Sequence, residues 1–248
     1  GLPGAAAPVP GDAPAYLWKA GRLSAVERFR PLPLERLTGI DAQKAVLVEN
    51  SRRHAAGLPA HDVLLWGARG MGKSALAKAA PAACGLPVIE APGDALSGLP
   101  ALFSVLSRSE RRFIVFLDDL SVESEGAARA LRSLLEGGVE ARPDSCRLYV
   151  TSNRRHLVAR DMGENDPVNP RDVADDRLAL ADRFGLSIGF HDCDQATYLA
   201  IVRRYAEAHD LPLLESDALA WATGRGGRSG RVAWQYIQEL AGREGVAL

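Results

Sequence analysis

The sequence predicts a three-layer α/β domain with a parallel five-stranded sheet, followed by a small C-terminal helical domain. Short apolar segments alternate with helical stretches between residues 41 and 190, as in folds built from strand–helix–strand units. One of these segments, Phe113–Leu117, is apolar at every position, which is typical of a central strand covered by helices on both faces. After His191 the strand pattern stops and only helical patterns follow.

The elements of the α/β domain follow one another regularly along the chain. Asp41 can cap a helix that extends to about Ala56. The charge-rich stretch from Arg160 to Asp182 contains two prolines and is expected to form a long surface excursion. The expected strands are Val63–Trp66, Pro87–Ile89, Phe113–Leu117, Arg147–Val150 and Leu186–Phe190. The expected helices between them are Lys73–Ala83, Leu99–Ser107 and Glu125–Leu135.

The helical domain is expected to begin near Asp192. Its three helices each have a suitable capping residue just before the apolar positions, namely Asp194, Ser216 and Ser229. At the other end, residues 1–14 contain four prolines and little to bury, which predicts a mobile leader, and residues 16–33 are expected on the domain surface. The chain therefore divides into a leader and surface segment (1–33), an α/β domain (34–191) and a helical lid (192–248).

The composition excludes several classes of protein. Of the 248 residues, 47% are hydrophobic and 25% are charged, which excludes a wholly disordered chain. The formal net charge of −1 gives no global attraction to nucleic acid or to an anionic membrane, and no apolar run approaches the roughly 18 residues of a membrane span. Three widely spaced cysteines argue against a disulfide framework or a zinc ribbon. Together with the lack of a secretory leader pattern, they predict a cytoplasmic protein.

A glycine-rich segment after the first apolar run matches the pattern GxxxxGK[ST]. It spans Gly67–Ser74, between a predicted strand and a predicted helix, and its lysine is one of only four in the chain. Glycines let the backbone amides of such a loop surround a phosphate, and the helix N-terminus adds a positive dipole. Lys73 is expected to reach the β- and γ-phosphates, and Ser74 to ligate Mg²⁺. The expected ATP-binding residues here are Gly67, Ala68, Arg69, Gly70, Met71, Gly72, Lys73, Ser74 and Ala75.

Polar residues follow two of the predicted strands at their carboxyl ends, where α/β sheets bind ligands. Asp118 is expected to hold Mg²⁺, and Asp119 to orient or deprotonate an attacking water; a simple turn or helix cap is the structural alternative. Glu123 is an alternative base. Asn153 is expected to position the water, although a turn-forming asparagine would give the same pattern.

These motifs, in this order and followed by a helical tail, resemble the AAA+ ATPases. They are more closely similar to a bacterial family within that group, domain-of-unknown-function family 815, over a region from about Leu34 to the C-terminus. The residues that carry the resemblance are Leu37–Lys44, Val63–Gly70, Phe116–Ser121, Thr151–Leu157, Asp182–Gly185 and Arg228–Ala233.

The resemblance implies a P-loop NTPase fold of the AAA+ type and assigns roles residue by residue. Gly67–Ser74 becomes the Walker A loop, Asp118 and Asp119 become the Walker B acids, and Asn153 becomes sensor 1. The remaining assignments are Arg183 as arginine finger, Arg231 as sensor 2 on the lid, and Ile40 as part of the adenine pocket.

An arginine finger generally reaches the nucleotide of a neighbouring subunit, so the resemblance implies a homo-oligomer with Arg183 acting in trans. The alternatives are that Arg183 pairs with Asp176 or Asp182 on its own surface, and that Arg231 is a solvated helix position. Two residues depart from the expected pattern: Met71 replaces a threonine or serine, and Asp119 replaces a longer glutamate. The second departure leaves the rate of hydrolysis open.

The sequence favours an ATPase that couples Mg-ATP binding and hydrolysis to rearrangement of the lid and of subunit contacts, with an unknown protein partner. One alternative is a nucleotide-dependent switch that does not hydrolyse ATP. Another is a nucleic-acid-associated initiator or loader, for which Arg154–Arg155, Arg203–Arg204 and Arg225–Arg231 offer local basic patches. A polypeptide-threading unfoldase is disfavoured, because Glu90–Asp94 carries no aromatic residue.

Overall fold

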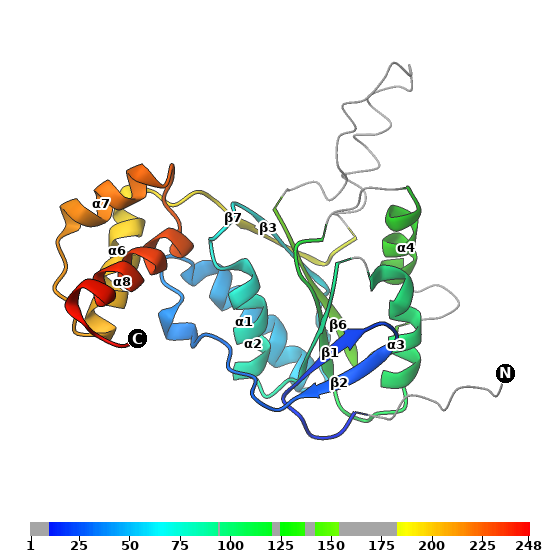
Figure 1. Cartoon of the computed structure of the whole chain (residues 1–248). Coiled ribbons are helices and arrows are strands. Elements are labelled where there is room, and N and C mark those ends of the chain that lie inside the picture. Colours follow the sequence, from blue (N-terminus) through cyan, green and yellow to red (C-terminus); the bar gives the residue numbers. More distant parts are fainter. Residues whose placement is uncertain (1–9, 94, 121–124, 137–141, 154–182) are drawn as a thin grey trace, which may run out of the picture.

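The computed structural model describes residues 10–93, 95–120, 125–136, 142–153 and 183–248 (Figure 1). These residues include a seven-stranded sheet with the order β2-β1-β4-β5-β6-β3-β7, in which only β2 is antiparallel to its neighbour. The predicted parallel α/β sheet is therefore confirmed, with two more strands than expected. The strands are β1 (Ala15–Lys19), β2 (Arg22–Val26), β3 (Val63–Gly67), β4 (Val88–Ala91), β5 (Phe113–Leu117), β6 (Cys146–Ser152) and β7 (Leu186–Phe190).

The two additional strands form a hairpin over residues 15–26, most of which the sequence predicts on the domain surface. Strand β1 pairs in parallel with β4, and the side chains of Tyr16 and Trp18 are almost completely buried. The hairpin turns at Ala20 and Gly21, whose φ angles are 49° and 72°. Two-residue hairpin turns usually contain Asn-Gly, and this turn has Ala-Gly instead. Because alanine seldom adopts a left-handed conformation, the sequence gives no signal for a hairpin here. Residues 15–26 therefore pair with the sheet of the α/β domain.

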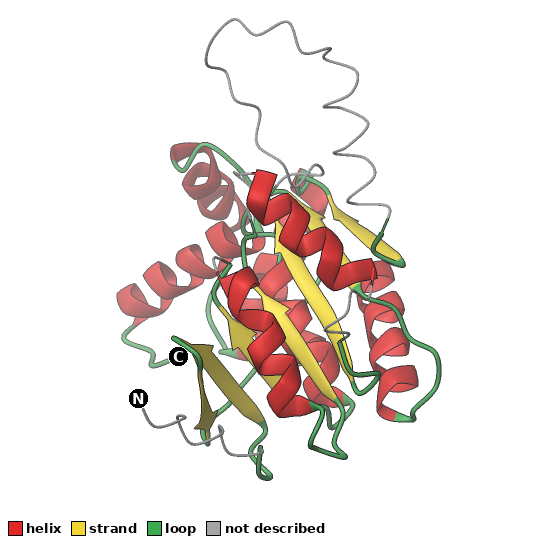
Figure 2. Ribbon diagram, turned by 90° about the vertical axis from the view of Figure 1, so that its right-hand side faces the viewer, coloured by secondary structure: helices red, strands yellow, loops and turns green. Residues whose placement is uncertain are grey.

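Helices cover both faces of the sheet, as Figure 2 shows. In β5, Ile114 and Phe116 pack in the same cluster as residues of α1 and α2, whereas Phe113, Val115 and Leu117 pack with residues of α3 and α4. This alternation explains why every position of the strand is apolar. The helices of this domain are α1 (Asp41–Ala55), α2 (Lys73–Ala83), α3 (Leu99–Leu106) and α4 (Glu125–Glu136), with 3-10 turns at Leu34–Arg36 and Ala95–Gly98.

The lid consists of α6 (Gln195–Ala208), α7 (Glu215–Gly224) and α8 (Gly230–Glu244). Two of the expected caps are confirmed: Asp194 accepts a hydrogen bond from the amide of Thr197, and Ser229 accepts one from that of Val232. Ser216 does not cap α7, which already begins at Glu215. Likewise, Asp41 is the first residue of α1 rather than its cap, and it lies 2.6 Å from Lys44 in an ion pair.

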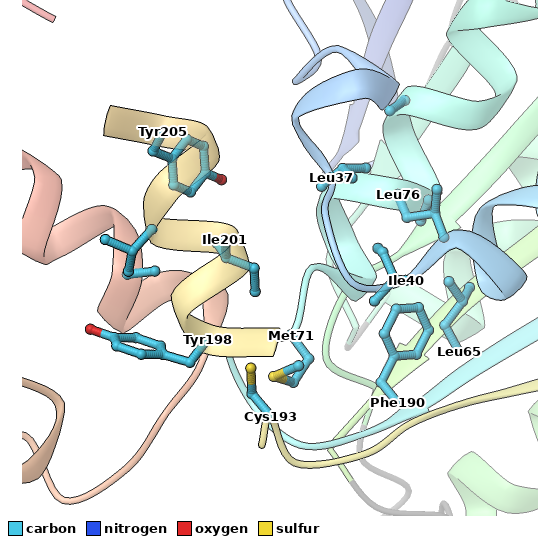
Figure 3. Close-up of a cluster of buried hydrophobic side chains, with 14 of the residues drawn as sticks. Leu37, Ile40, Leu65, Met71, Leu76, Phe190, Cys193, Tyr198, Ile201 and Tyr205 are labelled. Atoms are coloured by element: carbon cyan, nitrogen blue, oxygen red, sulfur yellow. The ribbon is translucent and has the colours of Figure 1, made fainter. Parts of the chain in front are cut away.

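The lid packs directly against the α/β domain on the side of α1 and α2 (Figure 1). One buried apolar cluster includes Ile40 and Met71 of the α/β domain together with Cys193, Tyr198 and Ile201 of the lid (Figure 3). None of the helices in the described ranges combines the length and the apolar character needed to cross a bilayer.

Candidate functional site

A cavity of about 640 Å³ lies between the α/β domain and the lid. Its floor includes the loop after β3, the residues after β5 and the end of β6, so it sits at the carboxyl edge of the parallel strands. That edge is the usual ligand site of open α/β sheets. The predicted site residues that line it are Ile40, Arg69, Gly70, Met71, Gly72, Lys73, Ser74, Ala75, Asp118, Asp119, Asn153 and Arg231.

The segment Gly67–Ser74, here called the glycine loop, joins β3 to α2. Gly70 and Gly72 have φ angles of 76° and 90°, in the left-handed region that other residues seldom adopt. Gly72 is also the residue before the first turn of α2, so the unpaired amides at the N-terminus of that helix lie at the cavity. This geometry suits an anion such as a phosphate.

Lys73 is buried beside the cavity, with 6% of its surface exposed. Its Nζ donates hydrogen bonds to the carbonyl oxygens of Gly67 and Ala68, at 2.8 and 2.7 Å, and to Oδ1 of Asn153 at 3.3 Å. Burial lowers the pKa of the ammonium group, and the charges of Asp119 and Asp118 oppose that shift. The structure thus brings together Lys73 and Asn153, two residues that the sequence separates by 80 positions.

Asp118 is held by two hydroxyl groups. Its Oδ1 accepts hydrogen bonds from Ser74 Oγ at 2.6 Å and from Thr151 Oγ1 at 2.7 Å. The predicted proximity of Ser74 and Asp118 is therefore present. Thr151 was not among the predicted site residues, although it lies two positions before Asn153.

Asp119 adopts an unusual backbone conformation with a φ of 49°. Such a conformation costs on the order of 1 kcal/mol for a residue with a side chain, and Asp tolerates it better than most. The side-chain amide of Asn153 donates a hydrogen bond from Nδ2 to Oδ1 of Asp119. The backbone amide of Asp119 donates one to Thr151 Oγ1 at 2.8 Å. The alternative base Glu123 lies outside the described residues.

The oxygen atoms around Ser74 and Asp118 fit a magnesium ion. Mg²⁺ is usually held by one or two protein oxygens, by water and by the phosphates of its nucleotide. In the described parts of the chain, no group of three or more His, Cys, Asp and Glu side chains could hold a metal by itself. A hydroxyl and a carboxylate beside the glycine loop are donors of the kind that Mg²⁺ uses when phosphate oxygens and water complete its shell.

Outside residues 69–75, apolar and aromatic side chains form much of the cavity wall, and of these Ile40 is the predicted one. Tyr205 and Trp234 of the lid meet edge to face, with ring centroids 5.1 Å apart. Arg36, in the 3-10 turn before α1, also lines the cavity. The further apolar lining residues are Leu32, Leu37 and Ile201. These wall residues come from the stretch before α1 and from α6 and α8 of the lid, so the wall joins parts of the chain that are far apart in sequence.

Arg183 does not line the cavity. Its Nε lies 2.5 Å from Oε1 of Glu136 at the end of α4, and the Arg183 side chain is 30% exposed. The alternative partners Asp176 and Asp182 lie outside the described residues. Arg231, in contrast, reaches the site through its backbone as well: its amide donates to the carbonyl of Gly70 at 3.1 Å.

The fold is similar to that of RuvB from Thermotoga maritima. One solved structure, the RuvB Holliday junction branch migration motor, is 18% identical with a TM-score of 0.59, and the match covers 84% of this chain and 64% of that one. The T158V variant is 21% identical, with a TM-score of 0.60 and the same coverage. The chain thus spans less than two thirds of the length of RuvB.

At this level of identity the likeness shows the fold alone, an α/β domain with a mostly parallel sheet followed by helices. No curated protein matches the sequence. A family model described as "Protein of unknown function (DUF815)" matches residues 11–244, and the chain therefore belongs to that family.

Proposed function

We propose that this protein binds ATP together with Mg²⁺ and hydrolyses it. The observation that carries the proposal is the grouping of Lys73, Ser74 and Asp118 at a glycine loop that opens a helix and faces a cavity of about 640 Å³. A cavity of this size suits a small organic ligand. The AAA+ type fold supports a nucleotide as that ligand.

Each group of residues at the cavity has a proposed role in binding one part of Mg-ATP. The ammonium of Lys73 would turn from the carbonyls of Gly67 and Ala68 towards the phosphates, and the amides of the glycine loop would bind the same group. Ser74 and Asp118 would hold Mg²⁺, which neutralises charge on the phosphate oxygens when it is bound. Ile40 and the aromatic pair Tyr205–Trp234 give the apolar surface that a nucleobase needs.

Asp119 and Asn153 are proposed to orient the attacking water. Their mutual hydrogen bond holds both groups at the cavity, but it also occupies the Asp119 carboxylate. Since Asp119 is shorter than the expected glutamate by one methylene group, a nucleotide-dependent switch without hydrolysis is the second candidate function. Steady release of phosphate by the wild type, dependent on Asp119, would decide in favour of the ATPase.

Arg183 is proposed to act as a finger on the nucleotide of a neighbouring copy, which implies a homo-oligomer. Arg183 lies outside its own cavity, as a finger acting in trans requires, and its ion pair with Glu136 would have to open before it could reach a neighbour. Arg231 is proposed to sense the nucleotide from the lid. A protein partner is preferred to nucleic acid because the net charge is only −1, although the similarity to a branch migration motor makes DNA the first ligand to test.

Calorimetric titration with ATP in the presence and absence of Mg²⁺ tests the proposal. The wild type should bind, and Lys73→Ala should abolish binding, because the lysine supplies the buried positive charge for the phosphates. Lys78→Ala provides a control, since Lys78 also lies on α2 but pairs with Glu90 at 2.7 Å. Undiminished affinity of Lys73→Ala would refute the assignment of the glycine loop.

A further inference from the structure

Thr151 lies at the centre of the link between β6 and the two acids that follow β5. Its hydroxyl oxygen is 2.7 Å from Oδ1 of Asp118 and 2.8 Å from the backbone nitrogen of Asp119. Its carbonyl oxygen accepts a further hydrogen bond from the amide of Leu120, at 2.8 Å. One residue therefore contacts three consecutive positions of the neighbouring segment.

The direction of each hydrogen bond follows from the groups involved. The amide of Asp119 is only a donor, so the Thr151 hydroxyl must accept from it. The single hydroxyl hydrogen then remains available for Asp118, whose carboxylate is only an acceptor when ionised. The hydroxyl is thus used in both directions at once, and Thr151 is 1% exposed, so little water competes for these bonds.

The backbone needs such support at this point. Regular pairing between β5 and β6 ends with Leu117 opposite Val150. Beyond it the chain enters the left-handed conformation of Asp119, which is stable only where its surroundings fix it. The hydrogen bonds of Thr151 extend the link between the two segments through these positions.

Ser74 cannot replace Thr151 in this role. Ser74 belongs to the first turn of α2 and is itself a proposed metal ligand, so its position follows the glycine loop and the nucleotide. Thr151 belongs to β6, a central strand of the sheet, and offers a fixed reference that is independent of the loop.

We propose that Thr151 is a positioning residue, whose hydroxyl sets the Asp118 carboxylate for Mg²⁺ and the Asp119 backbone for hydrolysis. This inference rests on the proposed function. Groups that orient a metal ligand typically contribute 10- to 100-fold to metal affinity or activity. The methyl group of Thr151 is not part of the mechanism, so serine should serve as well as threonine, and valine should not.

The test compares Thr151→Val, which keeps the shape but lacks the hydroxyl, with Thr151→Ser, which keeps the hydroxyl. Calorimetry should give ATP affinity in EDTA close to that of the wild type for both variants. In Thr151→Val the Mg²⁺ concentration needed to tighten ATP binding should rise about 10- to 100-fold, and kcat should fall more than KM changes. Thr151→Ser should stay near the wild type in both measurements.

A second readout needs neither metal nor turnover. The amide of Asp119 should exchange its hydrogen faster in Thr151→Val than in the wild type or in Thr151→Ser. If valine leaves Mg²⁺ dependence and exchange unchanged, or if serine loses as much as valine, the inference is overturned. Should the valine variant fail to fold, Thr151→Ala takes its place, and the serine variant still decides whether the hydroxyl is sufficient.

The outcomes also separate this inference from the proposed function. A wild type that binds Mg-ATP without turnover would contradict hydrolysis, yet the Mg²⁺ dependence of binding would still report on Thr151. A wild type that does not bind ATP would refute the proposed function, and the role of Thr151 towards Mg²⁺ would fall with it.

Discussion

The backbone amide of Arg231, in the first turn of α8, donates a hydrogen bond to the carbonyl oxygen of Gly70 in the glycine loop. The lid and the glycine loop therefore contact each other through their backbones. A Cβ atom on Gly70 would lie 2.9 Å from Ser229 Oγ and 3.0 Å from the Cβ of Arg231, which leaves no room for a side chain. A ligand that moves the loop would therefore act on the start of α8 through this hydrogen bond.

Gly70→Ala should disturb this contact. Alanine at a φ of 76° is strained by roughly 1 kcal/mol, and overpacking against the lid adds about 1–3 kcal/mol. ATP affinity should fall about tenfold or more, and the Arg231 amide should exchange faster. Gly85→Ala is a matched control, since its φ is 73° and nothing lies within 4 Å of the added methyl. Equal effects of the two variants on Arg231 exchange would contradict the contact.

Asp118→Ala should separate nucleotide binding from turnover. Without the carboxylate, ATP should still bind in EDTA through Lys73 and the loop amides, whereas Mg²⁺-dependent phosphate release should drop by at least about 100-fold. Calorimetry and a phosphate-release assay measure the two effects. Asp217→Ala, an acid in the first turn of α7, is the control. An unchanged rate in Asp118→Ala would remove Asp118 from the proposed site.

Arg183→Ala should lower turnover mainly at concentrations where the chains associate. An arginine finger inserted by a neighbouring chain raises kcat about 10³- to 10⁵-fold. In a dissociated chain no finger is inserted, so the substitution should not change its rate. The measurement is turnover per chain against protein concentration, with oligomer mass followed in parallel. Arg243→Ala is a suitable control, because Arg243 also forms an ion pair with an exposed glutamate, Glu239. Turnover that depends on neither concentration nor Arg183 would exclude action in trans.

Acid should destabilise the protein through His54. Its Nε2 lies 3.2 and 3.1 Å from the carbonyl oxygens of Phe113 and Ser145, so that nitrogen carries a hydrogen, and the side chain is fully buried. Burial, and then the charge of Arg147, lowers the pKa of His54 to about 4 from 6.5. The unfolded chain therefore binds the proton first as the pH falls.

It follows that the free energy of unfolding should be unaffected by His54 above pH 6.5, and should decline by up to about 3 kcal/mol between pH 6.5 and 4. Urea unfolding at several pH values measures this decline. His54→Gln, which cannot titrate, should flatten the pH dependence. A slope in His54→Gln equal to that of the wild type would contradict the assignment.

The sheet core and the glycine loop could be predicted because their signals are local. A buried parallel strand is apolar at each position, as β5 is, and the loop needs glycine, lysine and serine at fixed spacing. The hairpin β1–β2 was missed because its turn uses Ala20 at a positive φ. The start of α7 was misplaced because Glu215, held by Arg203 on α6 at 2.5 Å, begins the helix without a side-chain cap.

The parts of the site that escaped prediction depend on contacts between distant segments. Thr151 meets Asp118 and Asp119 only because β5 and β6 pair in one register, with Leu117 opposite Val150. A shift by one residue would turn the hydroxyl to the other face of the sheet. Arg183 pairs with Glu136, which is 47 positions away and belongs to another element. No local pattern in the sequence predicts this ion pair.

The contact at Gly70 also places the glycine loop at one end of α8. The helix has 15 residues and is therefore about 22 Å long, and the loop touches it at its very start. A swing of roughly 10° about that pivot would carry the distal tip through about 4 Å. A shift beside the glycine loop that is too small to break the hydrogen bond would thus become a much larger displacement near Glu244. A molecule bound at that end of α8 would meet a changed surface.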